Sequence, residues 1–172
     1  MAQKETVREL SLIALFSAIT FAVTFFNIPL FPSTGGLIHF GNVFLFTAAL
    51  LFGPKYGAWS GAIGMGLFDV LGGYAIWAPC TILVRYFMGL VVGRLGYQTA
   101  STSRQFLAMV AGGIICIIGY YVYEGIFISN FIVALSSALG DLISITAAII
   151  ITFLLLPLVK RLREFVEHRF KI

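Results

Sequence analysis

The chain has 172 residues, of which 60% are hydrophobic and only 10% are charged, and its mean hydropathy is +1.02. Soluble domains carry roughly 25% charged residues, so this composition excludes an ordinary soluble protein and predicts an integral membrane protein. The net charge of +4 does not indicate nucleic acid as a partner, because no basic face interleaved with aromatic residues accompanies it. Since a spanning helix needs about 20 apolar residues, the length leaves room for about six spans and short loops.

The N-terminal segment "MAQKETVRELSLIALF" carries its charges before the first apolar run. That run continues past Phe26 without a small-residue cleavage site, so we expect a permanent helix over about residues 8–28 rather than a signal peptide. Ala14, Ala18 and Ala22 recur every four residues along it, a spacing that lets another helix approach closely inside a membrane. This alanine strip either packs inside the bundle or docks a second protein.

The segment 29–40 is a long outer connection, which we interpret as a lid over a cavity. It contains two prolines, a glycine pair and His39, and Asn42 follows it closely. A lone histidine at a membrane interface is either a hydrogen-bonded structural residue or a ligand contact. No second histidine or cysteine joins it, so we expect no metal site.

Proline, glycine and polar clusters predict five further helices, over about residues 41–53, 56–72, 78–95, 105–128 and 132–157. The first two of these are short and rich in glycine, so they are either tilted or partly enclosed by protein. Glycines at four-residue spacing, such as Gly57 with Gly61 and Gly89 with Gly93, predict close helix packing. We therefore expect an all-α, six-helix transmembrane bundle that forms a single integral membrane domain over residues 1–172.

Ten of the eleven Lys and Arg residues fall in segments that six spans place on one side of the membrane. The positive-inside rule makes that side cytoplasmic, together with both termini, and the opposite loops 29–40, 73–77 and 129–131 contain no Lys or Arg. The tail "VKRLREFVEHRFKI" mixes basic and apolar residues, and we expect it to lie along the inner leaflet. Arg85 is the exception, because it falls inside the fourth apolar run.

Four ionisable residues lie within apolar runs, toward the outer ends of the predicted helices: Asp69, Arg85, Glu124 and Asp141. A charged side chain deep in a bilayer costs at least about 2.5 kcal/mol, so each should face protein or water. Helical periodicity adds polar and aromatic neighbours on the same faces, namely Trp77, Thr81 and Met88 beside Arg85, Tyr120 or Tyr121 beside Glu124, and Ser137 and Ser144 beside Asp141. The pattern predicts an outward-facing cavity for a small polar, aromatic molecule.

Two roles stay open for some of these residues. Arg85 either neutralises an acid as a structural ion pair or contacts the ligand, and the two roles can coexist. Asp69 either lines the cavity or caps the loop that follows it. Cys80 and Cys116 lack metal-ligand spacing, and we interpret them as packed apolar residues.

An enzyme is the first competing class. Ser60 falls near the inner surface and His39 near the outer one, so they cannot form a catalytic pair, and no Walker sequence is present. A stand-alone proton-coupled carrier or channel for a small polar solute is the alternative transport function. The buried acids cluster in the outer half of the chain's helices, which favours a closed-ended cavity over a continuous path.

The order of these features resembles the substrate-binding S components of energy-coupling factor (ECF) vitamin transporters. The likeness covers nearly the whole chain and is carried by the alanine strip, "HFGN", "LFGPKYGAWSGAIGMGLFDVLGGY" and "WAPCTILVRYFMGLVVG". The "GPKYG…D…GGY…WAP" series looks most like the riboflavin-type branch, which also contains proteins assigned to hydroxymethylpyrimidine or vitamin B6-like compounds.

The resemblance implies a binding protein of the bacterial cell membrane, embedded in membrane lipid, with no catalytic site and no bound cofactor. It would capture a vitamin from outside and dock through the alanine strip on a transmembrane T protein, while two ABC ATPases use the ATP. In the family the ligand lies between the first outer loop and helices four to six. We rank hydroxymethylpyrimidine or pyridoxine first, and riboflavin or another B vitamin second, because acids, an arginine and aromatic rings suit a substituted pyrimidine or pyridine.

The candidate substrate-binding residues are His39, Asn42, Asp69, Trp77, Thr81, Arg85, Tyr120, Tyr121, Glu124, Ser137 and Asp141.

Overall fold

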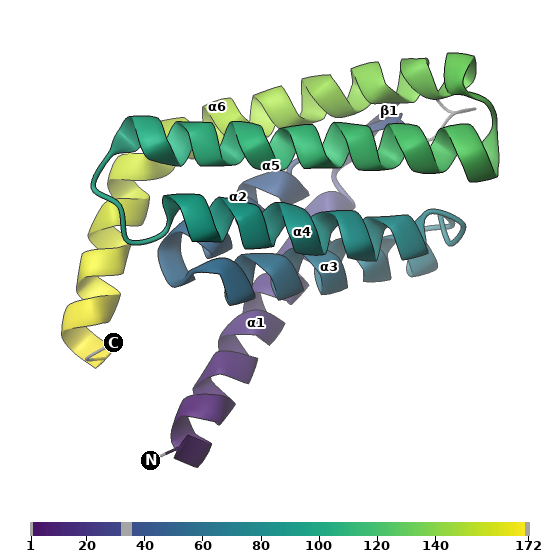
Figure 1. The fold of residues 1–172 in the computed structure, drawn as a ribbon. Helices are drawn as coiled ribbons and strands as arrows, with labels where there is room; N and C mark the ends of the chain where they lie inside the picture. The colour runs from purple at the N-terminus through teal and green to yellow at the C-terminus, as the bar shows by residue number, and fades with distance from the viewer. Residues whose placement is uncertain (1, 32–35, 171–172) are drawn as a thin grey trace.

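A computed structural model describes residues 2–31 and 36–170 of the chain, and these fold into six α-helices with short connections (Figure 1). The helices are α1 (Ala2–Thr24), α2 (Gly41–Phe52), α3 (Pro54–Leu71), α4 (Ala78–Gly96), α5 (Thr102–Tyr123) and α6 (Phe131–Phe170). Four helical segments of the described chain are long and apolar enough to cross a membrane: Thr6–Thr24, Ala78–Gly96, Thr102–Ile128 and Phe131–Leu162. The expected all-helical architecture is confirmed.

The remaining helices, α2 and α3, are the two that the sequence marks as short. Nine of the twelve residues of α2 are buried, so this helix is enclosed by its neighbours rather than exposed along its length. Gly53 joins α2 to α3 with a φ of 107°, a conformation that residues with a side chain rarely adopt. The chain can therefore reverse direction between the two helices at a single residue.

Glycine brings α3 and α4 into backbone contact. A Cβ atom added to Gly89 would stand 2.3 Å from the carbonyl carbon of Gly57, and one added to Gly93 would stand 2.3 Å from the Cα atom of Pro54. No side chain fits in either place, so the glycines serve packing inside the molecule, as their spacing predicts.

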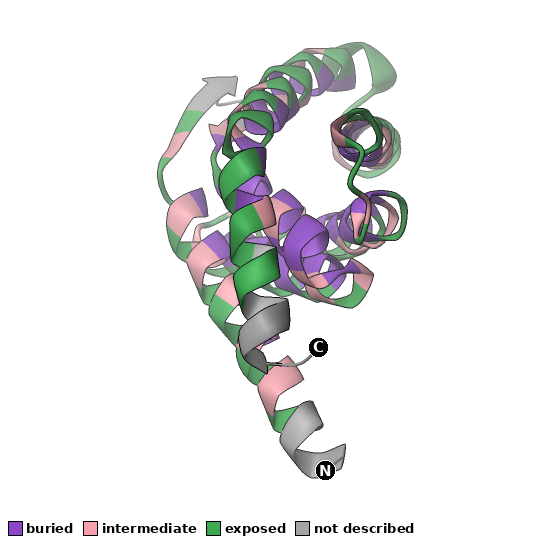
Figure 2. Cartoon of the chain, turned by 90° about the vertical axis from the view of Figure 1, so that its left-hand side faces the viewer, coloured by how far each residue is buried: buried purple, intermediate pink, exposed green. Residues whose placement is uncertain are grey.

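The alanine strip of α1 has the opposite environment. Ala14, Ala18 and Ala22 are exposed, whereas Ser17 and Thr20 on the other face of the helix are buried. Figure 2 shows the same division through the molecule, with buried residues on the inward sides of the helices. Packing inside the bundle is thus excluded as the role of this strip.

The outer connection that we interpret as a lid contains a two-stranded antiparallel hairpin, β1 (Asn27–Phe31) and β2 (Gly36–His39). Asn27 pairs with His39 and Ile28 pairs with Ile38, while residues 32–35 lie outside the described part of the chain. No strand was predicted in this segment from the sequence. A two-stranded ribbon accommodates Pro29 because each strand has a free edge where no N–H donor is needed.

The last helix runs past its expected end at residue 157 and continues to Phe170. Pro157 lies inside it, and the yellow end of α6 bends away from its first part in Figure 1, as a proline kink would produce. The ammonium of Lys160 donates hydrogen bonds to the carbonyl of Ala100 (3.1 Å) and to Oγ1 of Thr102 (2.9 Å). These bonds tie α6 to the connection between α4 and α5.

The connections lie at two opposite ends of the bundle. The α4–α5 connection lies to the left in Figure 1, where both chain ends also lie, and the α3–α4 and α5–α6 connections lie to the right. The binding pocket described next lies toward the second end.

Candidate binding site

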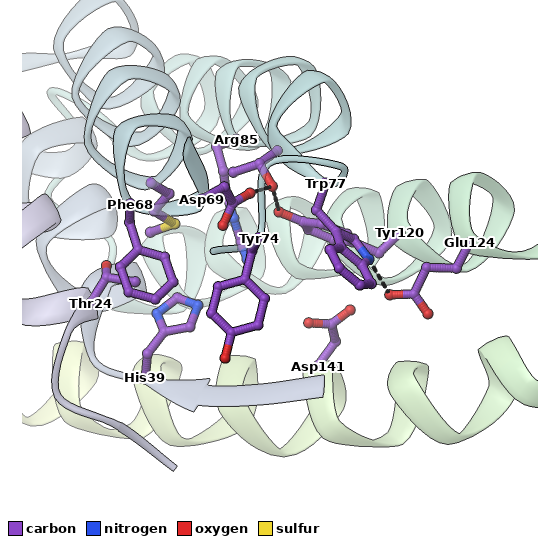
Figure 3. A pocket seen from close by; sticks show the side chains of 12 residues that line it. Thr24, His39, Phe68, Asp69, Tyr74, Trp77, Arg85, Tyr120, Glu124 and Asp141 are labelled. Atoms are coloured by element: carbon purple, nitrogen blue, oxygen red, sulfur yellow. Dashed lines mark hydrogen bonds between the residues drawn. The ribbon is translucent and has the colours of Figure 1, made fainter. Parts of the chain in front are cut away.

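A pocket is enclosed by the hairpin and by helices α1, α3, α4, α5 and α6 (Figure 3). It contains about 500 Å³ of empty volume, a figure that includes the open space at its mouth. The lining residues are Thr24, His39, Met65, Phe68, Asp69, Tyr74, Trp77, Thr81, Arg85, Tyr120, Glu124 and Asp141. Six separate elements therefore contribute to one chamber.

Three polar side chains form a hydrogen-bonded chain along one wall. The hydroxyl of Thr81 on α4 donates to Oδ2 of Asp69 on α3, and its oxygen lies 2.6 Å from the hydroxyl oxygen of Tyr120 on α5. Since the single Thr81 proton goes to Asp69, Tyr120 is the donor to Thr81. Asp69 thus lines the pocket through its side chain, while its backbone carbonyl accepts a hydrogen bond of 2.8 Å from the N–H of Tyr74 in the loop that follows.

Arg85 lies one helical turn from Thr81 and is only 3% exposed. Its Nη1 atom donates to Oδ1 of Asn42 at 2.8 Å and to the sulfur of Cys116 at 2.9 Å, and its guanidinium lies 5.1 Å from the centre of the Tyr120 ring. Within the described part of the chain no carboxylate oxygen comes within 4.0 Å of its nitrogen atoms, and the ion pair between Lys55 and Glu9 (2.5 Å) lies elsewhere. Arg85 is therefore held by neutral groups and an aromatic face rather than by an acid.

Glu124 begins a short π-helix, η1 (Glu124–Ile128), that continues α5. Such π turns are frequent at functional sites because the extra residue re-aims side chains. The indole nitrogen of Trp77 donates to Oε1 of Glu124 at 3.2 Å, and the buried Ser137 lies within hydrogen-bonding reach of the same carboxylate.

Aromatic rings form another wall of the pocket. The rings of Phe68 and Tyr74 are stacked with centres 5.7 Å apart, and Tyr74 meets Trp77 edge to face at 6.1 Å. Tyr123 donates a hydrogen bond of 2.6 Å to the carbonyl of Ile76, which holds the segment between Tyr74 and Trp77 against α5. A flat aromatic ligand can stack against such a wall.

Asp141 and His39 complete the lining from α6 and β2. Figure 3 shows the carboxylate of Asp141 directed into the pocket, and it accepts no hydrogen bond from any residue in the described ranges. The backbone N–H of His39 donates to Oγ of Ser144 at 3.4 Å, and the serine hydroxyl lies 3.4 Å from the carbonyl of His39. Burial, with a smaller contribution from Arg85, lowers the pKa of His39 to about 3, so the imidazole is neutral.

Of the eleven candidate residues, eight line the pocket and three do not. Asn42 stands behind Arg85 and positions it, Ser137 stands behind Glu124, and Tyr121 packs on Phe131 with ring centres 5.6 Å apart. Four further residues line the pocket that were not among the candidates: Thr24, Met65, Phe68 and Tyr74. Met65 and Phe68 share a helix face with Asp69, so periodicity along α3 could have indicated them.

Comparison with known proteins agrees with this arrangement. The sequence matches the family of ECF-type riboflavin transporter S components over residues 4–163, which is nearly the whole chain. It is 35% identical over 103 residues, or 60% of this chain and 68% of the relative, to an uncharacterized protein in a gap 3′ region of Pyrococcus woesei. It is 22% identical over 162 residues, or 94% of this chain and 93% of the relative, to the thiamine precursor transporter HmpT of Lactococcus lactis subsp. cremoris (strain MG1363).

The family match extends over all six helices, including every element that lines the pocket. The resemblance found from the sequence motifs is thereby confirmed, and this chain belongs to the family of ECF-type riboflavin transporter S components.

Proposed function

We propose that this chain is the membrane-embedded, substrate-binding subunit of an ECF-type importer and that it captures a B vitamin or vitamin precursor from outside the cell. The observation that carries the proposal is the convergence of Asp69, Arg85, Glu124 and Asp141, from four helices, on one pocket. The chain would form one integral domain of the cell membrane with six spans. Both termini would be cytoplasmic, because they share an end of the molecule with the α4–α5 connection, which Arg94 and Arg104 flank.

The ligand we propose is hydroxymethylpyrimidine or pyridoxine, with riboflavin or another B vitamin ranked second. Carboxylates accept hydrogen bonds from amino and hydroxymethyl groups, and the wall formed by Phe68, Tyr74 and Trp77 offers a surface for a six-membered ring. The relative HmpT, which transports a thiamine precursor and aligns along nearly the whole chain, favours the pyrimidine.

Docking on a T protein would use the exposed strip formed by Ala14, Ala18 and Ala22. Small side chains every four residues let a partner helix approach the backbone of α1 closely. Two ABC ATPases attached to the T protein would hydrolyse ATP, so this chain itself would need no cofactor. The proposal thus divides the molecule into a ligand-binding end and a docking face.

Ligand binding can be measured through Trp77, because the chain has two tryptophans and the other, Trp59, packs on Tyr86 with ring centres 5.2 Å apart and does not line the pocket. In the purified Trp59→Phe variant, the fluorescence of Trp77 should change saturably with one member of a panel of B vitamins and precursors. A Trp77→Phe variant should lose that signal. If no compound of the panel binds by fluorescence or by calorimetry, the proposed function is wrong.

Docking is tested by co-expression with a T protein and two ATPases. Ala14→Trp and Ala18→Trp should abolish co-purification while the isolated variants still bind ligand. Ile118→Trp is the matched control, since it places the same bulky ring at an exposed position on α5 (56% exposed). Uptake into vesicles that contain this chain alone, without ATP, would instead support a stand-alone proton-coupled carrier.

A further inference from the structure

We infer that the pocket admits the free alcohol form of its ligand and rejects the phosphate monoester of the same compound, and that Asp141 and Glu124 impose this choice. The inference rests on the proposed function and narrows its substrate class to unphosphorylated hydroxymethyl compounds. A phosphorylated form outside the cell would have to be hydrolysed by a phosphatase before this chain could bind it.

The first reason is the balance of charged groups around the pocket. Three carboxyl side chains line it, from Asp69, Glu124 and Asp141, against the single guanidinium of Arg85. A phosphate monoester carries about −1.5 to −2 charges at neutral pH, so it would add like charge to a chamber rich in carboxyl groups. Juxtaposed like charges at a binding surface suppress the wrong partner strongly.

The second reason is that the positive charge is already engaged. Arg85 is 3% exposed, its Nη1 atom is bonded to Asn42 and Cys116, and its face lies on Tyr120. Arginine recognises phosphate best through two parallel N–H donors on an open edge. Here Nη1 already donates to two protein groups, and Nε, which has no partner among the residues that the structure describes, is fully buried. His39 adds no positive charge, because its buried imidazole is neutral.

A helix N-terminus is the other group that could attract a phosphate, and α4 begins beside Trp77. Its first amides are largely unavailable. The N–H groups of Ala78 and Thr81 donate to the carbonyls of Ala75 and Trp77 at 3.2 and 2.9 Å, and Pro79 has no N–H. This terminus therefore offers little to balance the carboxyl groups.

The third reason is that Asp141 still needs a donor. Thr81 and Trp77 already donate to Asp69 and Glu124, whereas Asp141 accepts no bond from the residues that the structure describes. A ligand hydroxyl or amino group supplies a donor to it. Esterification replaces a hydroxyl donor with acceptor oxygens, so the phosphate ester loses this contact as well as meeting like charge.

The experiment compares matched pairs by calorimetry on the purified full-length chain: pyridoxine with pyridoxine 5′-phosphate, hydroxymethylpyrimidine with its phosphate, and riboflavin with FMN. For the pair whose alcohol binds, we expect the ester to bind at least about 100-fold more weakly. An ester that binds as tightly as its alcohol would overturn the inference and leave the proposed function standing. If no member of any pair binds, the proposed function fails and the inference falls with it.

Variants test which groups make the choice. Asp141→Asn and Glu124→Gln each replace a carboxyl group with an amide at nearly constant shape. Each should reduce the ratio of the ester's dissociation constant to the alcohol's by about tenfold. The matched control is Glu9→Gln, which makes the same replacement in the exposed pair with Lys55, away from the pocket. If Asp141→Asn abolishes all binding, the Glu124→Gln variant alone tests whether a carboxyl group excludes the ester. If the ratio of the two dissociation constants stays unchanged in every variant that binds, the carboxyl groups do not discriminate between alcohol and ester.

Discussion

Gly89→Ala is the sharpest test of how the fold positions the pocket. The new Cβ atom would stand 2.3 Å from the carbonyl carbon and 2.4 Å from the carbonyl oxygen of Gly57, whereas ordinary contact begins at 3.4 Å. Both atoms belong to backbone, so no side chain can turn aside, and α3 and α4 must separate by about 1 Å. Overpacking of this kind costs about 1–3 kcal/mol or more.

The same displacement should weaken ligand binding, because the hydrogen bond from Thr81 to Asp69 joins α4 to α3. We expect Gly89→Ala to lower the midpoint of thermal unfolding in detergent by about 2–10 °C, with a parallel loss of affinity in calorimetry. Gly113→Ala is the matched control on α5, where the Cβ would crowd one methyl group of Ile145 and meet no further atom before 3.9 Å. Equal stability and equal affinity in the two variants would refute the argument from backbone contact.

Two further predictions concern the pocket itself. Arg85→Ala should weaken vitamin binding by about 1–3 kcal/mol, because it leaves Asn42 without its buried donor and removes the cation from the face of Tyr120. A calorimetric titration of the purified variant with the vitamin measures this loss. If the variant binds with full affinity, Arg85 contributes only to the stability of the fold. Tyr120→Phe should weaken binding by about 1 kcal/mol through the lost bond to Thr81, whereas Tyr121→Phe should bind normally because that ring packs on Phe131. If Tyr121→Phe bound more weakly than Tyr120→Phe, Tyr121 and not Tyr120 would be the tyrosine of α5 that lines the pocket.

Periodicity predicted the α4 side of the pocket well. Trp77, Thr81 and Arg85 are four residues apart, and all three line the pocket. A helix has a fixed repeat, and a polar residue inside an apolar membrane helix must face protein or water rather than lipid. Within such a helix the position of one buried polar residue determines the positions of the others.

Helical periodicity could not distinguish between two adjacent residues, and it makes no prediction for residues in loops. Tyr120 and Tyr121 differ by about 100° around α5, and both lie near the face of Glu124, so packing of α5 against Thr81 makes the choice. Tyr74 lies in the connection between α3 and α4, where no helical repeat applies. The hairpin was not predicted because its strands are only five and four residues long and the first contains Pro29.

Two strips of small residues with identical spacing also have opposite environments. Gly89 and Gly93 of α4 are buried against the backbone at the start of α3, and Gly57 and Gly61 of α3 are buried against α2, whereas the alanines of α1 are exposed. Spacing shows only that a close approach is possible. Which strip finds its partner within the chain depends on how the helices are arranged, and that information is not local.

The environment of Arg85 explains how one chain can hold an unpaired guanidinium among three acids. If Arg85 formed an ion pair with Asp141 or Glu124, a ligand that contacts either group would first have to break that pair. Breaking it would cost free energy, because each separated charge would remain buried. Asn42 and Cys116 instead supply neutral acceptors, and Tyr120 supplies a π face, so the cation is held without occupying a carboxylate. Its charge still acts on the chamber as a whole, while the carboxylate of Asp141 remains open to a donor from outside. If the proposed donor-rich ligand binds here, no internal ion pair has to open first, which lowers the cost of binding.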